Sequence, residues 1–287
     1  MTADAIAAAE TETLQPLVEL LRGRRAVVLA GAGCSTESGI PDYRGPEGSL
    51  RARKPMQYQE FVRSEASRVR YWARSTVGWR RIAEARPNAA HHALASLEDV
   101  GVVRGIITQN VDGLHHAAGS RRVVELHGSL AQVRCLGCGS LVGRDAFQAR
   151  LMALNAEWAE RLDAGAEQAP DGDAELPGEA VESFRVPGCE RCGGVMKPDV
   201  VFFGENVPAA WVDEAWRLFG EADVLLVLGS SLTVYSGRRF IYRAQEQGMP
   251  IAVVNLGPTR ADEMAAVKVE GRLGRILPEL AEALRRG

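Results

Sequence analysis

The chain has 287 residues, of which 46% are hydrophobic and 25% are charged, and its formal net charge is −3. This is the composition of an ordinary globular protein, and without a basic excess we expect no direct binding to nucleic acid. The longest apolar runs have the length of a strand, well below the roughly 18 apolar residues of a membrane span. The acidic residues 1–15 show neither a secretory signal nor a transit peptide. We therefore expect a cytoplasmic protein without membrane contact, and nothing in the sequence implies an oligomer.

Five short apolar runs predict the buried strands of a parallel sheet. They cover residues 26–30, 103–108, 123–126, 224–228 and 251–254. The amphipathic stretches at 91–100 and 209–221 have the spacing of helices that pack on such a sheet. This alternation predicts an α/β fold with a Rossmann-like, doubly wound parallel sheet.

Glycine and small polar residues follow every one of these runs: GAG, QNVD, HG, GSS and NLG, in chain order. In open α/β sheets ligands bind outside the carboxyl ends of the strands, so we expect these five loops to meet at one crevice. Turn formation explains any one loop, but turns alone do not call for His, Asn, Gln and Asp.

Two segments interrupt the alternation. Residues 46–88 hold tryptophans and many arginines in a mostly helical composition, which predicts a helical cap over the crevice. Residues 131–199 begin and end with cysteine pairs and predict a small inserted zinc-binding module, whose acidic, glycine-rich middle we expect to be a mobile loop. The main domain is then discontinuous and comprises residues 1–45, 89–130 and 200–287.

The cysteine pairs are two CxxC motifs, Cys135 with Cys138 and Cys189 with Cys192. Four thiolates complete the tetrahedral shell of a structural Zn²⁺ and leave no open position for chemistry. Buried or redox-active CxxC motifs are the alternative. The fifth cysteine, Cys34, has no base beside it in the sequence and is expected to be a packing residue.

The turn GAGCST after the first strand favours a phosphate ligand, because glycine admits the ligand to the backbone and a following helix N-terminus supplies amide donors. The dinucleotide fingerprint is incomplete, however. Thr36 stands where the third glycine belongs, and no acidic residue closes a second strand about 20 residues later. Taken alone, the turn leaves the ligand open.

The motifs GAGCSTESGIPDYR, TQNVDGLHHAAG, ELHG, the paired CxxC, FGE, GSSLTVYSG and VNLG occur in the order found in sirtuins, the NAD-dependent protein lysine deacylases. This resemblance covers nearly the whole chain. The tracts YWARSTVGW and GPTRAD look like the class II branch, which includes lipoamidase and ADP-ribosyltransferase types. The resemblance implies that the main domain binds NAD as a co-substrate and that the partners are acylated lysine proteins or peptides.

The resemblance also implies which residues contact NAD. They are Gly31, Ala32, Gly33, Ser35, Glu37, Ile40, Asp42, Tyr43, Arg44, Gln109, Asn110, Asp112, Gly229, Ser230, Ser231, Asn255, Leu256, Gly257 and Leu273. Tyr43 replaces the phenylalanine usual in the family, and a phenol still covers a reactive sugar carbon. Asn255 takes the ribose-contacting role that an acidic residue has in dehydrogenases.

In the family mechanism the acyl-lysine oxygen attacks the ribose carbon as nicotinamide departs, and the products are nicotinamide and an O-acyl-ADP-ribose. A base must take the proton of a ribose hydroxyl. His127, in ELHG, has an ordinary pKa of about 6.5 that suits a general base. The expected catalytic residues are His127 and, as the resemblance implies, Asn110 and Asp112. A hydrogen-bonded structural histidine is the alternative for His127, and the other histidines are assigned no chemistry.

The resemblance places the acylated peptide between two segments, where it adds as a strand. Phe203, Gly204 and Glu205 form one segment, and residues 232–235 with Val234 form the other. Packing of residues 200–203 at the hinge is the alternative for the first segment. Tyr71 and Arg74 have the Y-x-x-R spacing that reads an acidic acyl group in another sirtuin branch, since a guanidinium fits a carboxylate. The hypothesis is that acidic or bulky acyl groups are removed better than acetyl; an arginine on a solvated cap helix is the alternative.

Three other functions compete with the deacylase. A mono-ADP-ribosyltransferase would use the same NAD site with another nucleophile. A non-catalytic NAD-binding scaffold is disfavoured because Asn110, Asp112 and His127 are all present. A dehydrogenase is disfavoured by the zinc module and by the missing acidic ribose partner.

Overall fold

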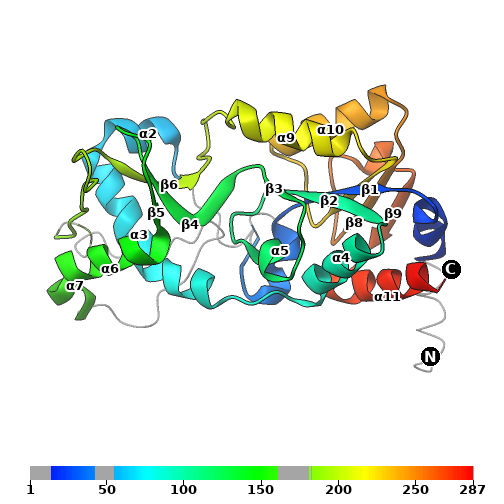
Figure 1. Ribbon diagram of the computed structural model, residues 1–287, viewed down its shortest axis with the longest axis horizontal. Helices are drawn as coiled ribbons and strands as arrows, with labels where there is room; N and C mark the ends of the chain where they lie inside the picture. Colours follow the sequence, from blue (N-terminus) through cyan, green and yellow to red (C-terminus); the bar gives the residue numbers. More distant parts are fainter. Residues whose placement is uncertain (1–13, 43–54, 161–180, 182, 287) are drawn as a thin grey trace.

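The structure, a computed structural model, describes residues 14–42, 55–160, 181 and 183–286. Its main feature is a six-stranded parallel sheet with the strand order β3-β2-β1-β7-β8-β9 (Figure 1). The strands are β1 (Ala26–Ala30), β2 (Val103–Thr108), β3 (Val123–Glu125), β7 (Val224–Leu228), β8 (Ile251–Asn255) and β9 (Val267–Glu270). The five apolar runs of the sequence form the first five of these strands, so the predicted parallel sheet is confirmed. Strand β9 was not predicted.

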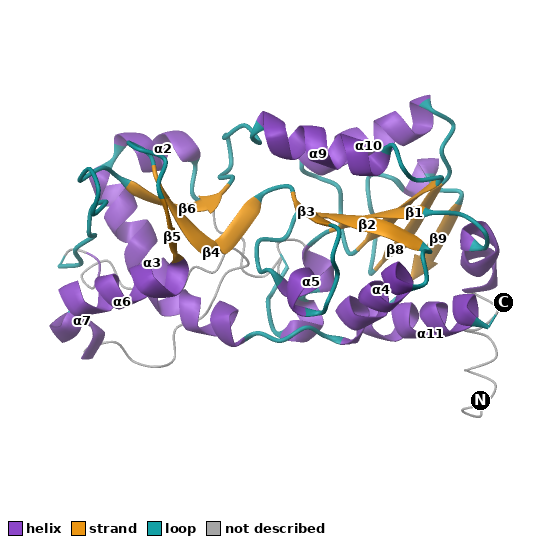
Figure 2. Cartoon of the chain, viewed as in Figure 1, coloured by secondary structure: helices purple, strands orange, loops and turns teal. Residues whose placement is uncertain are grey.

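Two layers of helices cover this sheet, because successive side chains of a strand point to opposite faces. Val28 of β1 packs with residues 14–21, α4 (Ala89–Asp99) and α11 (Leu273–Arg285). Leu29 packs with the opposite layer, α9 (Ala209–Phe219) and α10 (Tyr235–Glu246). Figure 2 shows α9 and α10 on one side of the strands and α4 and α11 on the other. The sheet is thus doubly wound, as predicted.

A second lobe holds a three-stranded antiparallel sheet in the order β5-β4-β6. It consists of β4 (Gly128–Cys135), β5 (Leu141–Gly143), β6 (Met196–Val200), α2 (Tyr58–Arg63), α3 (Glu65–Glu84), α6 (Arg144–Leu154) and α7 (Ala156–Glu160). Trp72 of α3 and Phe147 of α6 are fully buried in one hydrophobic core and their ring centroids lie 4.7 Å apart. The described parts of the helical cap and of the cysteine segment therefore form one lobe.

The two lobes meet directly after His127. Gly128 pairs with Val200 and has a φ of +79°, and a Cβ at Gly128 would lie 2.1 Å from the carbonyl oxygen of Asp199. Only glycine fits this close approach in the left-handed region. The antiparallel sheet consequently begins before residue 131 and ends after residue 199, the bounds expected for the inserted module. His127 stands at the junction, where the chain leaves β3 for β4 (Figure 1).

The remaining elements are short. Helix α5 (Leu114–Ala117) follows β2, and 3₁₀ helices in the described residues cover Ala32–Cys34, Thr36–Ser38 and Asp262–Met264. In the described parts of the chain, no helix combines the length and the apolar character needed to cross a membrane. The loop expected to be mobile falls largely on residues 161–180 and 182, which lie outside the described residues.

Candidate active site

A cavity of about 990 Å³ lies at the carboxyl ends of the parallel strands, next to the second lobe. It is lined by His127 and by every described candidate for cofactor contact, namely Gly31, Ala32, Gly33, Ser35, Glu37, Ile40, Asp42, Gln109, Asn110, Asp112, Gly229, Ser230, Ser231, Asn255, Leu256, Gly257 and Leu273. Tyr43 and Arg44 lie outside the described residues. The five loops therefore converge on one crevice, as the strand ends predicted.

Ser35 ties the glycine-rich turn to the loop after β2. Its hydroxyl donates to Asp112 Oδ2 at 2.6 Å and accepts from Asn110 Nδ2 at 3.1 Å. The Asn110 amide also donates to the Gly31 carbonyl at 3.0 Å. Burial raises the pKa of Asp112, and the Ser35 hydroxyl opposes that shift. The polar groups nearest the turn are thus fixed by one another before any ligand arrives, which is the preorganisation that catalysis requires.

The loop after β7 packs against the same turn. The Gly33 amide donates to the Gly229 carbonyl at 2.9 Å, and a Cβ at Gly33 would lie 2.8 Å from Gly229 Cα. Gln109 Nε2 donates to Ser230 Oγ at 2.9 Å and so joins this loop to the loop after β2. Hydrogen bonds therefore join the three loops after β1, β2 and β7 into one wall of the cavity.

The turn itself differs from the expectation. The sequence predicted a helix whose free N-terminal amides bind phosphate, but residues 32–38 form two short 3₁₀ helices. The Cys34 amide bonds to the Gly31 carbonyl and the Ser35 amide to the Ala32 carbonyl, while Gly33 uses its amide for Gly229. These three amides have acceptors within the protein, and two 3₁₀ helices stand where the sequence predicted one helix. Phosphate binding by this turn stays a prediction.

His127 is held by two hydrogen bonds. Its Nδ1 lies 2.9 Å from the Gln109 carbonyl oxygen, which can only accept, so Nδ1 carries the proton. Its Nε2 lies 2.7 Å from the Ser236 hydroxyl, which therefore donates to it. Burial lowers the pKa of His127; the Gln109 carbonyl opposes this, and the charge of Arg239 adds to it. The imidazole is a neutral base with Nε2 as its accepting atom.

Ser236 and Arg239 were not among the predicted site residues, although both line the cavity. They lie near the start of α10, one turn apart, and Arg239 Nε donates to the Ser236 carbonyl at 3.0 Å. Gly237 lies between them, and a Cβ there would lie 2.7 Å from Gln109 Oε1. Ser236 lies in the motif GSSLTVYSG, but its hydrogen bond to His127 is seen only in the structure.

Glu37 joins the glycine-rich turn to the start of α11. Its Oε2 accepts from the Gly274 amide at 2.7 Å, and a Cβ at Gly274 would lie 2.6 Å from the same oxygen. The carboxylate thus caps a helix whose N-terminal residue Leu273 lines the cavity. Negative charge at a helix N-terminus is stabilising. The contact gives Glu37 a structural role beside the predicted one in cofactor binding.

The predicted peptide-binding segments face the same cavity, which Phe203, Gly204, Glu205 and Val234 all line. The Phe203 carbonyl accepts from the Tyr58 amide at 2.9 Å, so the first segment is joined to α2. On the other side, the buried Leu232 has a φ of +56°, the one positive value of a non-glycine residue in the described chain. Such strain in a bulky residue is typical of functional sites.

Only one of the two residues of the Y-x-x-R motif lines the cavity. Tyr71 lines the cavity and is buried among Phe61, Trp72 and Phe202, with ring centroids 5.2 to 5.5 Å away. Arg74, half-buried on the same helix, is not among the residues that line this cavity. The structure therefore brings only the tyrosine to the site.

The four CxxC cysteines come together in the second lobe, although the two pairs are far apart in the sequence. All four sulfur atoms lie within 4.8 Å of one another. The distance from Cys135 to Cys192 Sγ is 3.5 Å and that from Cys138 to Cys189 is 3.8 Å. A tetrahedron of thiolates about 2.3 Å from zinc has edges of about 3.8 Å, whereas a disulfide needs about 2.0 Å. The donor set fits one structural Zn²⁺.

The other notable cysteine and histidines lie in the core. Cys34 is buried, and burial raises its pKa to about 12, so its thiol is a packing group as predicted. His91 helps to cap the N-terminus of α4, where its Nδ1 accepts from the Asn88 backbone amide at 3.3 Å in a capping box. Asn88 in turn donates to the Cys34 carbonyl at 2.8 Å. Asn88, which anchors the glycine-rich turn to α4, was not among the predicted site residues.

Comparison with known proteins decides the family. Residues 31–236 match the profile of the Sir2 family. The chain belongs to the Sir2 family, the sirtuins. This sirtuin is 53% identical over 261 residues to NAD-dependent protein deacetylase 2 of Bradyrhizobium diazoefficiens, a match that covers 91% of this chain and 94% of that relative. It is 54% identical over 270 residues to NAD-dependent protein deacetylase 1 of Mycobacterium avium, covering 93% and 94% of the two chains.

Solved structures agree with this assignment. A complex of Sir2 with a p53 peptide and NAD⁺ is 30% identical, with a TM-score of 0.74 over 96% of this sirtuin and 99% of that chain. A complex of a Sir2 homologue with NAD is 32% identical, with a TM-score of 0.71 over 94% and 93% of the two chains. The class II branch, expected from YWARSTVGW and GPTRAD, stays a prediction.

Proposed function

We propose that this sirtuin is an NAD-dependent protein lysine deacylase that releases nicotinamide and an O-acyl-ADP-ribose. The observation that carries the proposal is the hydrogen-bonded imidazole of His127, which lines the same cavity as the glycine-rich turn. Relatives at 53% and 54% identity over more than nine-tenths of the chain bear the name NAD-dependent protein deacetylase. Acetyl-lysine in a protein or peptide is the substrate class that these names favour.

The cavity suits a dinucleotide together with a peptide side chain. Its volume of about 990 Å³ is at the upper end of the range for small-molecule sites. Bound NAD supplies a ribose carbon whose pyridinium substituent is a good leaving group. In the proposed binding mode, Asn110 and Asp112, which Ser35 holds by hydrogen bonds, contact the ribose and nicotinamide end. Asn255 and the loop after β8, which line the same cavity, contact the adenosine end.

His127 is proposed as the general base for a ribose hydroxyl. Its Nε2 accepts from Ser236 Oγ at 2.7 Å, so the entering hydroxyl would replace or share this donor. Because the Gln109 carbonyl holds the Nδ1 proton, the accepting lone pair stays on the cavity side. The lowered pKa keeps the base neutral at physiological pH.

Product analysis tests this function. The purified protein is incubated with NAD and an acetyl-lysine peptide, and all products are weighed by mass spectrometry. We expect deacetylated peptide, nicotinamide and O-acetyl-ADP-ribose in equal amounts, and a loss of at least about a hundredfold in rate for His127→Ala. Unchanged peptide together with ADP-ribose on protein would instead assign a mono-ADP-ribosyltransferase. Acyl removal that His127→Ala leaves unchanged would refute the role of His127.

A further inference from the structure

Lys197 is a buried cation next to the predicted peptide-binding segment. It lies on β6, and its side chain is 6% exposed. The ammonium group pairs with Glu205 Oε2 at 2.9 Å and donates to the carbonyls of Val200 and Pro198. Each of its three protons thus has an acceptor within the protein. The group does not line the cavity and has no donor left for a ligand.

Glu205 connects Lys197 to the cavity wall, because its carboxylate contacts both Lys197 and the backbone of Phe202. The same Oε2 accepts from the Phe202 amide at 2.8 Å, and the Glu205 amide donates to the Phe202 carbonyl at 3.0 Å. Residues 202–205 therefore form a closed turn, with Gly204 at a φ of +77°. Lys197 fastens this turn to the end of β6.

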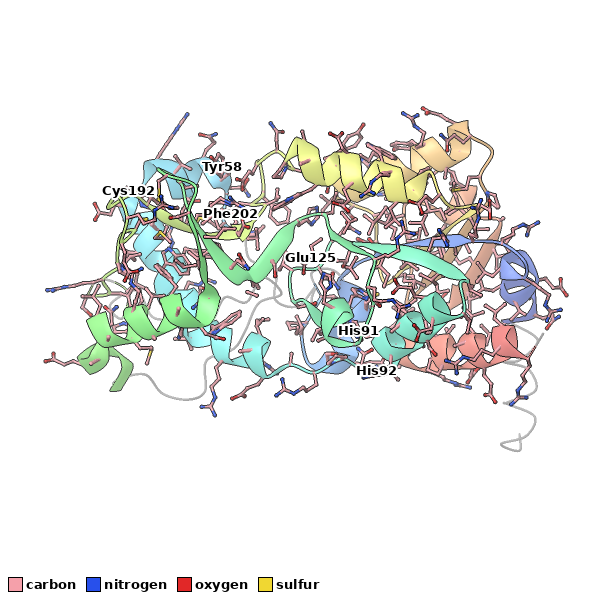
Figure 3. All side chains as sticks on the ribbon, in the orientation of Figure 1. Tyr58, His91, His92, Glu125, Cys192 and Phe202 are labelled. Carbon is pink, nitrogen blue, oxygen red and sulfur yellow. The ribbon has the colours of Figure 1, made fainter. Side chains whose placement is uncertain are left out.

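Two aromatic rings lie close to the ammonium group of Lys197. Lys197 Nζ lies 4.5 Å from the ring centroid of Phe202 and 5.8 Å from that of Tyr58. Figure 3 shows Tyr58 and Phe202 close together beside β6. Burial lowers the pKa of Lys197, and the bond to Glu205 opposes that shift. Breaking one partner of such a pair would leave a buried, uncompensated charge.

The same turn is aligned with the proposed base. The Val201 amide donates to the His127 carbonyl at 2.8 Å, and Phe202, Phe203, Gly204 and Glu205 follow it along the cavity wall. A shift of the turn would move the peptide-facing backbone relative to His127 without touching the loops of β1, β2 and β7. Displacements of about 1 Å are enough to cost catalysis heavily.

We infer that Lys197 is a positioning residue: through its ion pair with Glu205 it holds the 202–205 turn at the distance from His127 that the acylated peptide requires. This inference rests on the proposed deacylase function and names a determinant of peptide binding. The residue acts through Glu205 and touches neither peptide nor NAD.

Steady-state kinetics with an acetyl-lysine peptide and NAD test it in Lys197→Met. We expect the KM for the peptide to rise about tenfold or more, while the KM for NAD changes by less than about twofold. The matched control is Arg134→Met on the neighbouring strand, which removes an ion pair with Asp199 of 2.7 Å but has no bond to the turn. In that control both KM values should stay within about twofold of wild type.

The double variant Lys197→Met/Glu205→Gln separates positioning from stability. It removes the uncompensated carboxylate, so we expect the melting temperature lost in Lys197→Met to return while the peptide KM stays high. Recovery of the peptide KM together with the melting temperature would overturn the inference. So would a peptide KM within about twofold of wild type in Lys197→Met. Should that variant fail to fold, Lys197→Gln, which also removes the cation but leaves Glu205 in place, must raise the peptide KM selectively. A wild-type protein without acyl removal would refute the proposed function instead.

Discussion

A pair of buried histidines should make this sirtuin sensitive to mild acid. His91 of α4 and His115 of α5 are 0% and 2% exposed, and their ring centroids lie 4.8 Å apart. Neither ring nitrogen of His115 and only Nδ1 of His91 has a hydrogen-bond partner in the described part of the chain. Burial lowers the pKa of His91 to about 4 and that of His115 to about 3. Figure 3 shows His91 beside α5.

Acid lowers the stability because the histidines have lower pKa values in the folded protein than in the unfolded chain. The folded protein keeps these rings neutral, whereas the unfolded chain protonates them near pH 6.5, so stability is lost as the pH falls below 6.5 and the loss levels off near the folded pKa values. For His115 alone, the loss at pH 5.5 relative to pH 7.5 is about 1.4 kcal/mol. Glu125 acts in the opposite direction, because burial raises its pKa to about 7. A comparison of variants cancels that contribution.

Urea unfolding at pH 7.5 and 5.5 measures the effect in wild type and in His115→Leu. Leucine removes no hydrogen bond and has a similar volume, so the variant should lie within about 1 kcal/mol of wild type at pH 7.5. Between pH 7.5 and pH 5.5, wild type should lose about 1.4 kcal/mol more unfolding free energy than the variant does. The exposed neighbour His116→Gln is the matched control and should follow the wild-type curve. Parallel curves for wild type and His115→Leu, within about 0.3 kcal/mol, would refute the reasoning.

The zinc site, the base and the acyl pocket each carry a further test. Cys135→Ser should lower the zinc content below one ion per chain and reduce the free energy of unfolding by several kcal/mol, because Cys135 lies in the hydrophobic core of the second lobe. Elemental analysis that finds one zinc ion per chain in the variant would contradict this. Arg239→Leu should move the acid limb of the kcat/KM profile to higher pH, because the guanidinium lowers the pKa of His127; an unmoved limb would count against that coupling. If acidic acyl groups are read by Arg74, Arg74→Ala should slow turnover of glutaryl peptides more than of acetyl peptides, and a clear acetyl preference that the variant leaves unchanged would end that hypothesis.

The strands could be predicted from the sequence because burial on both faces leaves a continuous apolar run, as in Val224–Leu228, where every residue is buried. Strand β9 escaped the same reasoning. It lies at the sheet edge, and of its four residues only Val269 is buried, so its VKVE pattern resembles an exposed segment.

The site was predicted where the residue type itself carries the chemistry. The cysteine pairs and His127 are of this kind, and the loops that line the cavity follow from the strand ends. The remainder depends on contacts between distant parts of the chain. Ser236 meets His127 across 109 residues, and the Trp72 indole donates to the Met196 carbonyl across 124 residues. No local pattern encodes such contacts. The cytoplasmic location also stays a prediction.

The most direct measurement follows the oxygen atom of the acyl group. A peptide whose acetyl-lysine carries isotopically heavy oxygen in the amide is turned over with NAD, and the products are separated and weighed. If one cavity aligns this amide with the glycosidic bond beside His127, the heavy oxygen must remain on the ribose carbon that nicotinamide left. Heavy oxygen recovered in free acetate would show direct hydrolysis and contradict the account.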